Sequence, residues 1–334
     1  MKLVSYLQNG DVKLGAIVQQ QLYSLQAVNE QLPNDIIGFL QQGVQVRLET
    51  EKKLLSMAAT HSLPSPVKDY SLLAPVPRPN SCRDGYAFRQ HVETARRNRG
   101  VDMIKEFDEY PIFYFTNHNA VQGPGPIYCM PDHFQQLDFE LEIAIVIGKE
   151  GKNIKAKDAD NYIAGFTIMN DLSARKLQME EMLLNLGPAK GKDFSTVIGP
   201  WLVTPDELEN FLVAPKEGHV GNNYNLAMKC WVNDKLVSTG NVSEMDWTFA
   251  EIIERCSYGV NLYPGDVIGS GTVGTGCFLE LNGTGKLNDP NYKAQWLQPN
   301  DIVKMQIDGL GILENTIHAE ATDWSILSLK KVLK

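Results

Sequence analysis

The sequence predicts an α+β chain that is mainly β, with a small N-terminal β-rich domain before a larger domain. The chain has 334 residues, which exceeds the usual size of one domain. Short β-branched runs alternate with Gly/Pro turns through most of its length, without a βαβ repeat. A Pro-containing stretch at 61–66 interrupts a helical pattern, so we place the domains at residues 1–70 and 71–334.

The N-terminal part begins with a predicted β-hairpin. Its strands are Lys2 to Tyr6 and Lys13 to Val18, joined across Asn9-Gly10, a dipeptide that favours a type I′ turn. Two helices are expected to follow. The first begins near Asn34-Asp35, whose side chains are good N-caps, and the second spans Val44 to Ala59, where charged and apolar residues interleave at helical spacing.

In the larger part only two further helices are predicted, over residues 87–97 and 173–184. The second follows a buried strand, Ile163 to Met169, that ends at Asn170-Asp171 and feeds directly into the helix. This helix carries Arg175 and Gln178 three residues apart on one face. Asp171 is therefore either an N-cap of the helix or part of a ligand site at the strand end.

The most informative predicted strand is Leu137 to Ile147. Its odd-numbered positions are all apolar and predict a core face. Glu140 and Glu142 then lie together on the other face, about 7 Å apart. Like charges at that spacing repel, so this face is either exposed or holds a cation. Oxygen ligands alone favour Mg²⁺, Mn²⁺ or Ca²⁺ over zinc.

Composition excludes several classes of function. The net charge of −9 argues against broad nucleic-acid binding, which needs clustered Lys and Arg. Arg96, Arg97 and Arg99 form the only dense basic patch, either a solvated helix end or a site for a small anion.

Five cysteines without a CxxC pair indicate reduced thiols. No apolar run could cross a bilayer and no signal peptide is recognisable, so we expect a cytoplasmic protein without a membrane role.

Two further segments bear on the chemistry. The loop 187–196 is superficially similar to a phosphate-binding loop, but its glycine spacing is one residue short and Asp193 follows the lysine where Ser or Thr should stand. Asp84, Tyr86 and His91 bring an acid, a phenol and an imidazole within eight residues. Because no GxSxG elbow is present, activated water is the better candidate nucleophile.

Taken together, these segments resemble the fumarylacetoacetate hydrolase family. The match runs from about Ser81 to near the C-terminus. In order, it consists of Asp84-Gly85-Tyr86 with His91, Glu140-Leu141-Glu142, Asn170-Asp171-Leu172-Ser173-Ala174-Arg175 with Gln178, Gly191-Lys192-Asp193-Phe194, Ser270-Gly271-Thr272 and Leu279-Glu280. The resemblance implies a large mixed β-sheet, or β-roll, catalytic domain and a homodimer.

The resemblance also implies a role for each matching residue. The ligands of a divalent cation would be Asp84, Glu140, Glu142 and Asp171. The general base would be His91, oriented by Glu280. The groups around the substrate oxygens would be Arg175, Gln178 and Lys192. The remaining substrate-binding residues would be Tyr86, Arg99, Tyr114 and Thr272.

The activity implied by the resemblance is hydrolysis of a carbon–carbon bond in a small 1,3-diketo acid. Fumarylacetoacetate, which gives fumarate and acetoacetate in tyrosine degradation, is the expected type of substrate. The alternatives are an acylpyruvate hydrolase, an oxaloacetate decarboxylase or a metal-binding relative without catalysis. Two positions depart from the family pattern: Lys176 stands where Asp is usual, and Met182 stands where a Tyr contacts substrate.

Overall fold

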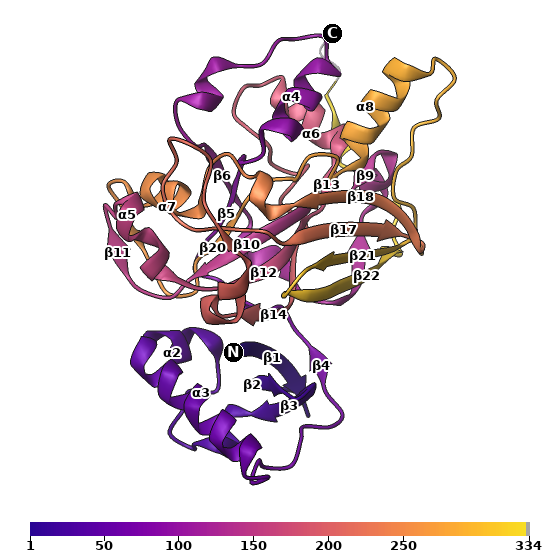
Figure 1. Ribbon diagram of the computed structural model, residues 1–334. Helices are drawn as coiled ribbons and strands as arrows, with labels where there is room; N and C mark the ends of the chain where they lie inside the picture. The colour runs from indigo at the N-terminus through magenta and orange to yellow at the C-terminus, as the bar shows by residue number, and fades with distance from the viewer. Residues whose placement is uncertain (332–334) are drawn as a thin grey trace.

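The computed structural model describes residues 1–331, and its largest sheet has eleven strands (Figure 1). The strand order is β3 (Gln21–Ser24), β2 (Asp11–Val18), β1 (Lys2–Gln8), β14 (Thr196–Val203), β12 (Ile163–Asp171), β10 (Leu141–Ile147), β20 (Val267–Gly269), β5 (Cys82–Gly85) and β6 (Phe113–Thr116), with β4 (Ser71–Leu72) paired to β1 and β7 (Val121–Gln122) paired to β14. The β20–β5 and β14–β7 pairs are parallel, so the sheet is mixed as predicted.

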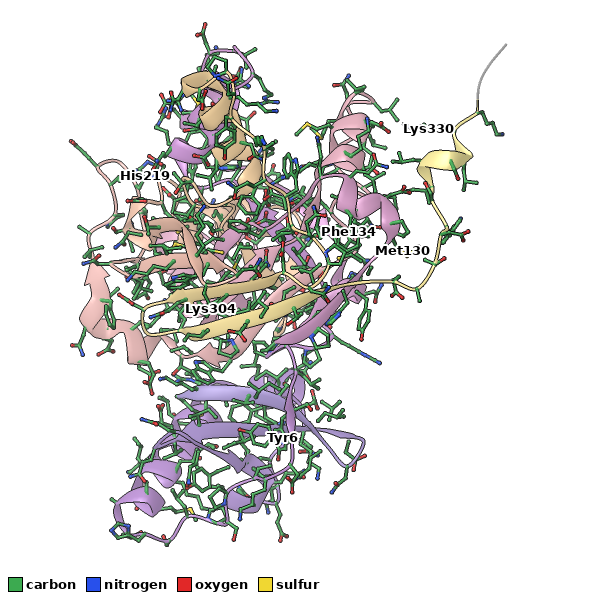
Figure 2. All side chains as sticks on the ribbon, turned by 90° about the vertical axis from the view of Figure 1, so that its right-hand side faces the viewer. Tyr6, Met130, Phe134, His219, Lys304 and Lys330 are labelled. Carbon is green, nitrogen blue, oxygen red and sulfur yellow. The ribbon has the colours of Figure 1, made fainter. Side chains whose placement is uncertain are left out.

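A second sheet has five strands. Their order is β18 (Lys235–Asn241), β17 (Ala227–Val232), β21 (Ile302–Ile307), β22 (Gly311–Ala319) and β8 (Gly125–Cys129). Lys304 lies on this sheet, in the larger part of the molecule, whereas Tyr6 lies in the N-terminal part (Figure 2). Within residues 1–331, the remaining β structure is three two-stranded ribbons: β11 (Gly151–Lys152) with β19 (Asn261–Leu262), β13 (Ser173–Ala174) with β9 (Leu137–Asp138), and β15 (Leu212–Val213) with β16 (Asn223–Tyr224).

The helices cover the sheets and their ends. The α-helices are α1 (Leu25–Val28), α2 (Ile36–Gln41), α3 (Val44–Ala59), α4 (Arg89–Arg97), α5 (Ala156–Ala159), α6 (Arg175–Met182), α7 (Phe249–Ser257) and α8 (Phe278–Asn288). Short 3-10 turns are η1 (Lys105–Asp108), η2 (His118–Ala120), η3 (Pro131–Gln135), η4 (Asp160–Tyr162), η5 (Pro205–Phe211), η6 (Val242–Glu244) and η7 (Leu327–Leu329). Figure 1 shows α4, α6 and α8 gathered at one end of the larger part, above the sheets.

The alternation along β10 separates two hydrophobic cores. Its odd-numbered residues, such as Ile143 and Ile145, pack into a core that also contains side chains of the second sheet, among them Met228 and Met305. Its even-numbered residues Ala144 and Val146 pack into another core, to which the N-terminal residues contribute. Both faces of β10 are therefore buried, as a near-continuous apolar run requires.

The predicted N-terminal hairpin is present. β1 and β2 pair antiparallel with Gln8 opposite Asp11, and the turn residues Asn9 and Gly10 have φ of 54° and 86°. Asp35 caps α2, since its Oδ1 accepts a hydrogen bond from the backbone N–H of Gly38 at 2.8 Å. α3 has the predicted bounds. The sheet continues from β1 into β14, and the domain division at residue 70 stays a prediction.

Two expectations for the larger part were wrong, and one alternative for Asp171 is excluded. The strand predicted from Leu137 to Ile147 is interrupted at Phe139 and Glu140, because the Glu140 N–H donates to the side chain of Asn170 (3.0 Å) while β9 pairs with β13. Three α-helices of this part, α5, α7 and α8, were not predicted. Asp171 does not cap α6, whose N-cap is Ala174 without a side-chain hydrogen bond.

Two further expectations concern cysteines and membranes. All five cysteines are free and buried, in agreement with the prediction of reduced thiols. Among residues 1–331, no helix has both the length and the apolar character needed to cross a bilayer.

Candidate active site

A cavity of about 650 Å³ opens beside α4, α6 and α8. It collects most of the residues that the sequence singled out. Those that line it are Asp84, Tyr86, His91, Arg99, Tyr114, Glu140, Arg175, Gln178, Lys192, Thr272 and Glu280. The other two predicted site residues, Glu142 and Asp171, are fully buried next to this set.

Three of the buried carboxylates come from strands of the large sheet. Asp84 lies on β5, Glu142 on β10 and Asp171 at the end of β12, with β20 between β10 and β5. Oxygens of Asp84, Glu140 and Glu142 lie within 4.8 Å of one another. The alternative of an exposed strand face was wrong, since Glu140 and Glu142 are only 5% and 0% exposed.

Two cations neutralise only one side of this cluster. Lys192 Nζ contacts Glu140 and lies 2.8 Å from Asp171 Oδ2, and Arg175 donates to Glu140 Oε1 at 2.7 Å. Burial alone would raise the pKa of Glu140, but Lys192 and Arg175 outweigh burial and lower this pKa to about 2.

For the other carboxylates, the effect of burial on the pKa exceeds that of the nearby cations. Burial, and then repulsion from Asp171, raises the pKa of Asp84 to about 7. Burial and the neighbouring acids raise the pKa of Glu142 well above its ordinary value. Burial also raises the pKa of Asp171, although Lys192 opposes the change. The cluster therefore favours binding of a further positive charge.

Unsatisfied oxygens provide a test of whether a divalent cation fits here. Within the part of the chain that the structure describes, Glu142 Oε2 and Asp171 Oδ1 are buried without a hydrogen-bond partner. Buried polar atoms are normally paired, and these belong to carboxylates, the ligands that hard divalent cations prefer. The donor set fits the predicted cation, and Mg²⁺, Ca²⁺ or Mn²⁺ remains a prediction for its identity.

A second functional group lies on the same cavity. His91, on α4, places Nδ1 2.8 Å from Oε2 of Glu280, on α8, although 189 residues separate them in the sequence. The other oxygen of Glu280 accepts the backbone N–H of Thr275 at 2.9 Å. The ring of Tyr86 meets the ring of His91 edge-on, with centroids 5.9 Å apart. These contacts fix the orientation of a buried imidazole.

The remaining predicted residues are distributed around this centre. Arg175 donates to Gln178 Oε1 at 3.0 Å, and Thr272 donates to Glu142 Oε1 at 3.3 Å. Tyr114 donates to Asp171 Oδ2. Arg99 lies exposed at the cavity, with its Nε donating to the Ala95 carbonyl.

The two departures from the family pattern differ in position. Met182 lines the cavity, so it contributes an apolar surface where the family has a phenol. Lys176 lies on the surface, where its ammonium is 2.9 Å from Glu180. Only the change at Met182 is placed to affect a bound substrate.

Sequence reasoning missed Asp138. This fully buried carboxylate accepts a hydrogen bond from Nε of Arg175 at 2.9 Å. It also accepts hydrogen bonds from the backbone N–H groups of Phe278 and Leu279, at 2.7 and 2.9 Å. Asp138 therefore connects Arg175, which contacts Glu140, to the start of α8, which carries Glu280. The signal was available, because Asp138 has the same even-numbered parity as Glu140 and Glu142.

A family model and several known proteins are similar to this chain. The family described as "Fumarylacetoacetate (FAA) hydrolase C-terminal" matches residues 81–318. Two mitochondrial oxaloacetate tautomerases, FAHD2B of Bos taurus and FAHD2A of Homo sapiens, are each 33% identical over 88% of this chain and 82% and 83% of their own. A fumarylacetoacetate hydrolase domain-containing protein 2 homolog of Dictyostelium discoideum is 27% identical over 95% of this chain and 97% of its own.

Solved structures agree on the fold. A fumarylacetoacetate hydrolase from Exiguobacterium antarcticum superposes with a TM-score of 0.69 at 24% identity, over 96% of this chain and 100% of that chain. A maleylpyruvate hydrolase from Sphingobium sp. SYK-6 gives 0.67 at 21% identity, with the same coverage. The predicted fold class, a mainly β α+β chain with a large mixed sheet, is confirmed.

The predicted cytoplasmic location is contradicted by the relatives, because the tautomerases of Bos taurus and Homo sapiens are mitochondrial proteins. The prediction depended on the lack of a recognisable secretory signal peptide. That feature distinguishes secreted proteins and does not separate the cytoplasm from the interior of an organelle.

Proposed function

Because the chain belongs to the fumarylacetoacetate hydrolase family, we propose that it is a metal-dependent hydrolase that cleaves a carbon–carbon bond in a small 1,3-diketo acid. Fumarylacetoacetate, in the degradation of tyrosine, is the proposed type of substrate. The observation that carries the proposal is the His91–Glu280 pair, which lines the same cavity as the acidic cluster.

The pair supports hydrolysis because it can activate water. With Nδ1 of His91 hydrogen-bonded to Glu280, Nε2 is the ring nitrogen left to take a proton from water. The resulting hydroxide adds to a carbonyl carbon of the diketone. Collapse of the adduct breaks the bond to the carbon between the two carbonyls, and that carbon takes the proton that His91 removed. The products are a ketone and a carboxylic acid.

Cations on the cavity wall support the same step. Arg175 and Lys192 are buried beside Glu140, and Gln178 is held by Arg175, so these groups can stabilise the oxyanion that forms on addition. Asp84, Glu140, Glu142 and Asp171 would hold the divalent cation. When bound, that cation would polarise the two carbonyl oxygens of a chelating diketone.

Product analysis tests the proposal. Purified protein with Mg²⁺ is incubated with fumarylacetoacetate, with acylpyruvates and with oxaloacetate, and the products are followed by NMR. We expect fumarate and acetoacetate, or a carboxylic acid and pyruvate, to accumulate in equal amounts. Failure to cleave any of the diketo acids would overturn the proposal.

A second candidate, keto–enol tautomerisation of oxaloacetate, is favoured by the relatives at 33% identity over 88% of the chain. The same pair could move a proton to and from the carbon between the carbonyls, without adding water. The two functions differ in products. A tautomerase speeds disappearance of enol-oxaloacetate and releases no fragment, whereas an oxaloacetate decarboxylase of this family would release pyruvate and CO₂.

We also propose a homodimer, as the family resemblance implies. Sedimentation of the purified protein, whose chain mass is 37.3 kDa, checks this. A species of about one chain mass at micromolar concentration would contradict it.

A further inference from the structure

One carboxylate outside the cavity lining holds the loop that carries Lys192. Glu181 lies in the last turn of α6 and accepts hydrogen bonds from three consecutive backbone N–H groups. Ala189 donates to Oε2 at 2.8 Å, Lys190 to Oε1 at 2.8 Å and Gly191 to Oε2 at 3.1 Å. Successive N–H groups that converge in this way form an anion-binding nest.

Glu181 occupies an unfavourable position on its helix, and the hydrogen bonds of the nest compensate for it. A carboxylate near a helix C-terminus faces the negative end of the helix dipole and is disfavoured there. Three donated hydrogen bonds offset that cost. The same loop is superficially similar in sequence to a phosphate-binding loop. The anion that it binds is the carboxylate of Glu181.

The loop held by Glu181 is packed tightly against α6. The Ala174 N–H donates to the Gly191 carbonyl at 2.8 Å, and a Cβ added to Gly191 would lie 2.5 Å from the backbone nitrogen of Gln178. Only glycine allows that approach. The next residue is Lys192, which is 4% exposed and reaches Glu140 and Asp171. The position of the buried ammonium is thus set by the loop.

We propose that Glu181 is a positioning residue that keeps Lys192 in the cavity by filling the nest of the 189–191 loop. This inference rests on the proposed function only where it concerns turnover, since the placement of Lys192 can be measured without substrate. Removal of the carboxylate should release the loop from α6 and move the ammonium away from Glu140.

The first test measures how accessible Lys192 is to an amine-acetylating N-hydroxysuccinimide ester, read by mass spectrometry. In Glu181→Ala we expect the labelling rate of Lys192 to rise about tenfold or more, because the loop opens locally. Lys155, which lies outside this loop and has a side chain that is 69% exposed, is the internal standard and should change little. The matched control is Glu180→Ala, which removes an adjacent carboxylate that pairs with Lys176 and Lys330 on the surface.

Added acetate separates positioning from a general loss of structure. In Glu181→Ala the nest is left without its anion, and acetate should refill it and protect Lys192 again, whereas chloride at the same concentration should not. Turnover of the best wild-type substrate should fall roughly 10- to 100-fold in kcat with KM nearly unchanged, and acetate should restore part of it. Wild type and Glu180→Ala provide the correction for any direct effect of acetate.

A second variant keeps the test decisive if Glu181→Ala does not fold. Glu181→Gln preserves the shape but presents an NH₂ group to backbone donors, so Lys192 should label at an intermediate rate and acetate should have no effect. Lys192 that remains protected, with kcat within about twofold of wild type in a folded variant, would overturn the inference. A wild-type protein that cleaves no diketo acid would instead contradict the proposed function, while the labelling result would still decide the role of Glu181.

Discussion

The ionisable side chains in and beside the cavity form two groups. His91 and Glu280 form a buried pair that can move a proton, whereas Asp84, Glu142 and Asp171 are buried acids with too few cations near them. Glu140 lies close to Asp84 and Glu142, and both Lys192 and Arg175 contact it. Substitutions in one group should therefore leave the function of the other largely intact.

The first prediction concerns His91. His91→Ala should retain Mg²⁺ affinity and lose roughly 10²–10⁴-fold in kcat, the range of a positioned general base. Glu280→Gln should lose less, because the ring stays in place with weaker orientation. Kinetics and calorimetric titration with Mg²⁺ check both.

His219 provides the matched control for that experiment. Its Nδ1 lies 3.0 Å from Glu251 Oε2, so it is also a His–Glu pair, but it does not line the cavity. His219→Ala should leave kcat unchanged. A His91→Ala enzyme that works within a few-fold of wild type would refute water activation by this pair.

The second prediction concerns Asp171. Asp171→Asn should weaken Mg²⁺ binding by at least about tenfold, since a hard cation loses one charged ligand. Calorimetric titration measures the affinity. Asp132→Asn is the control, because it changes a comparably buried carboxylate that binds Ser325 and Leu327 instead. Equal Mg²⁺ affinity in Asp171→Asn and wild type would remove Asp171 from the ligand set.

Helices and strands place these side chains through two periodicities. The period of two along β10 directs Glu142 away from the core that holds Ile143 and Ile145. The period of the helix brings Arg175 and Gln178 to one face of α6, where they are 3.0 Å apart. β10 thus turns Glu142 away from its apolar core face, and α6 presents Arg175 and Gln178 together to the cavity.

The third prediction concerns the N-terminal hairpin. Gly10 has φ of 86° and open space where a Cβ would lie, so Gly10→Ala is penalised only by backbone strain. It should lower the free energy of unfolding by about 1–2 kcal/mol. Gly10→Asn should cost less, because Asn tolerates this conformation. Urea denaturation measures both, and equal losses would contradict the role assigned to φ.

At the scale of the whole molecule, the fold buries three acids, Asp84, Glu142 and Asp171, close to one another. Burial raises the pKa of Asp84 from 3.8 to about 7. Its contribution to stability is thus fully present below pH 3.8 and is lost as the pH rises through about 7. A bound cation should reverse this loss, because it binds the ionised form in the folded state alone.

The fourth prediction compares metal-free wild type with Asp84→Asn by thermal unfolding. The Tm of Asp84→Asn minus that of wild type should increase as the pH rises from about 4 to about 7. The comparison cancels His133, whose pKa burial lowers to about 4 and whose contribution has the opposite slope. Excess Mg²⁺ at pH 7 should raise the Tm of wild type more than that of the variant. A Tm difference independent of pH would contradict the raised pKa.

The sequence by itself determined the features that depend on neighbours in the chain. Asn9-Gly10 set the hairpin turn, and alternation over residues 137–147 separated the core face from the acidic face. The helix of residues 44–59 was correct to its ends. The order of the motifs identified the family, and with it eleven of the residues that line the cavity. All of these are local or periodic signals, which survive in a one-dimensional pattern.

Tertiary structure alone decided the features that depend on distant contacts. α8 contains Gly283 and Gly285, poor helix formers, and its first N–H groups are capped by Asp138, 140 residues away from Phe278. Glu140 is not part of the predicted strand, because its backbone N–H donates a hydrogen bond to the side chain of Asn170. The N–H groups of Ala189, Lys190 and Gly191 found their anion in Glu181, on the preceding helix. In each case a buried polar group had to be paired, and only the folded chain determines which partner lies within reach.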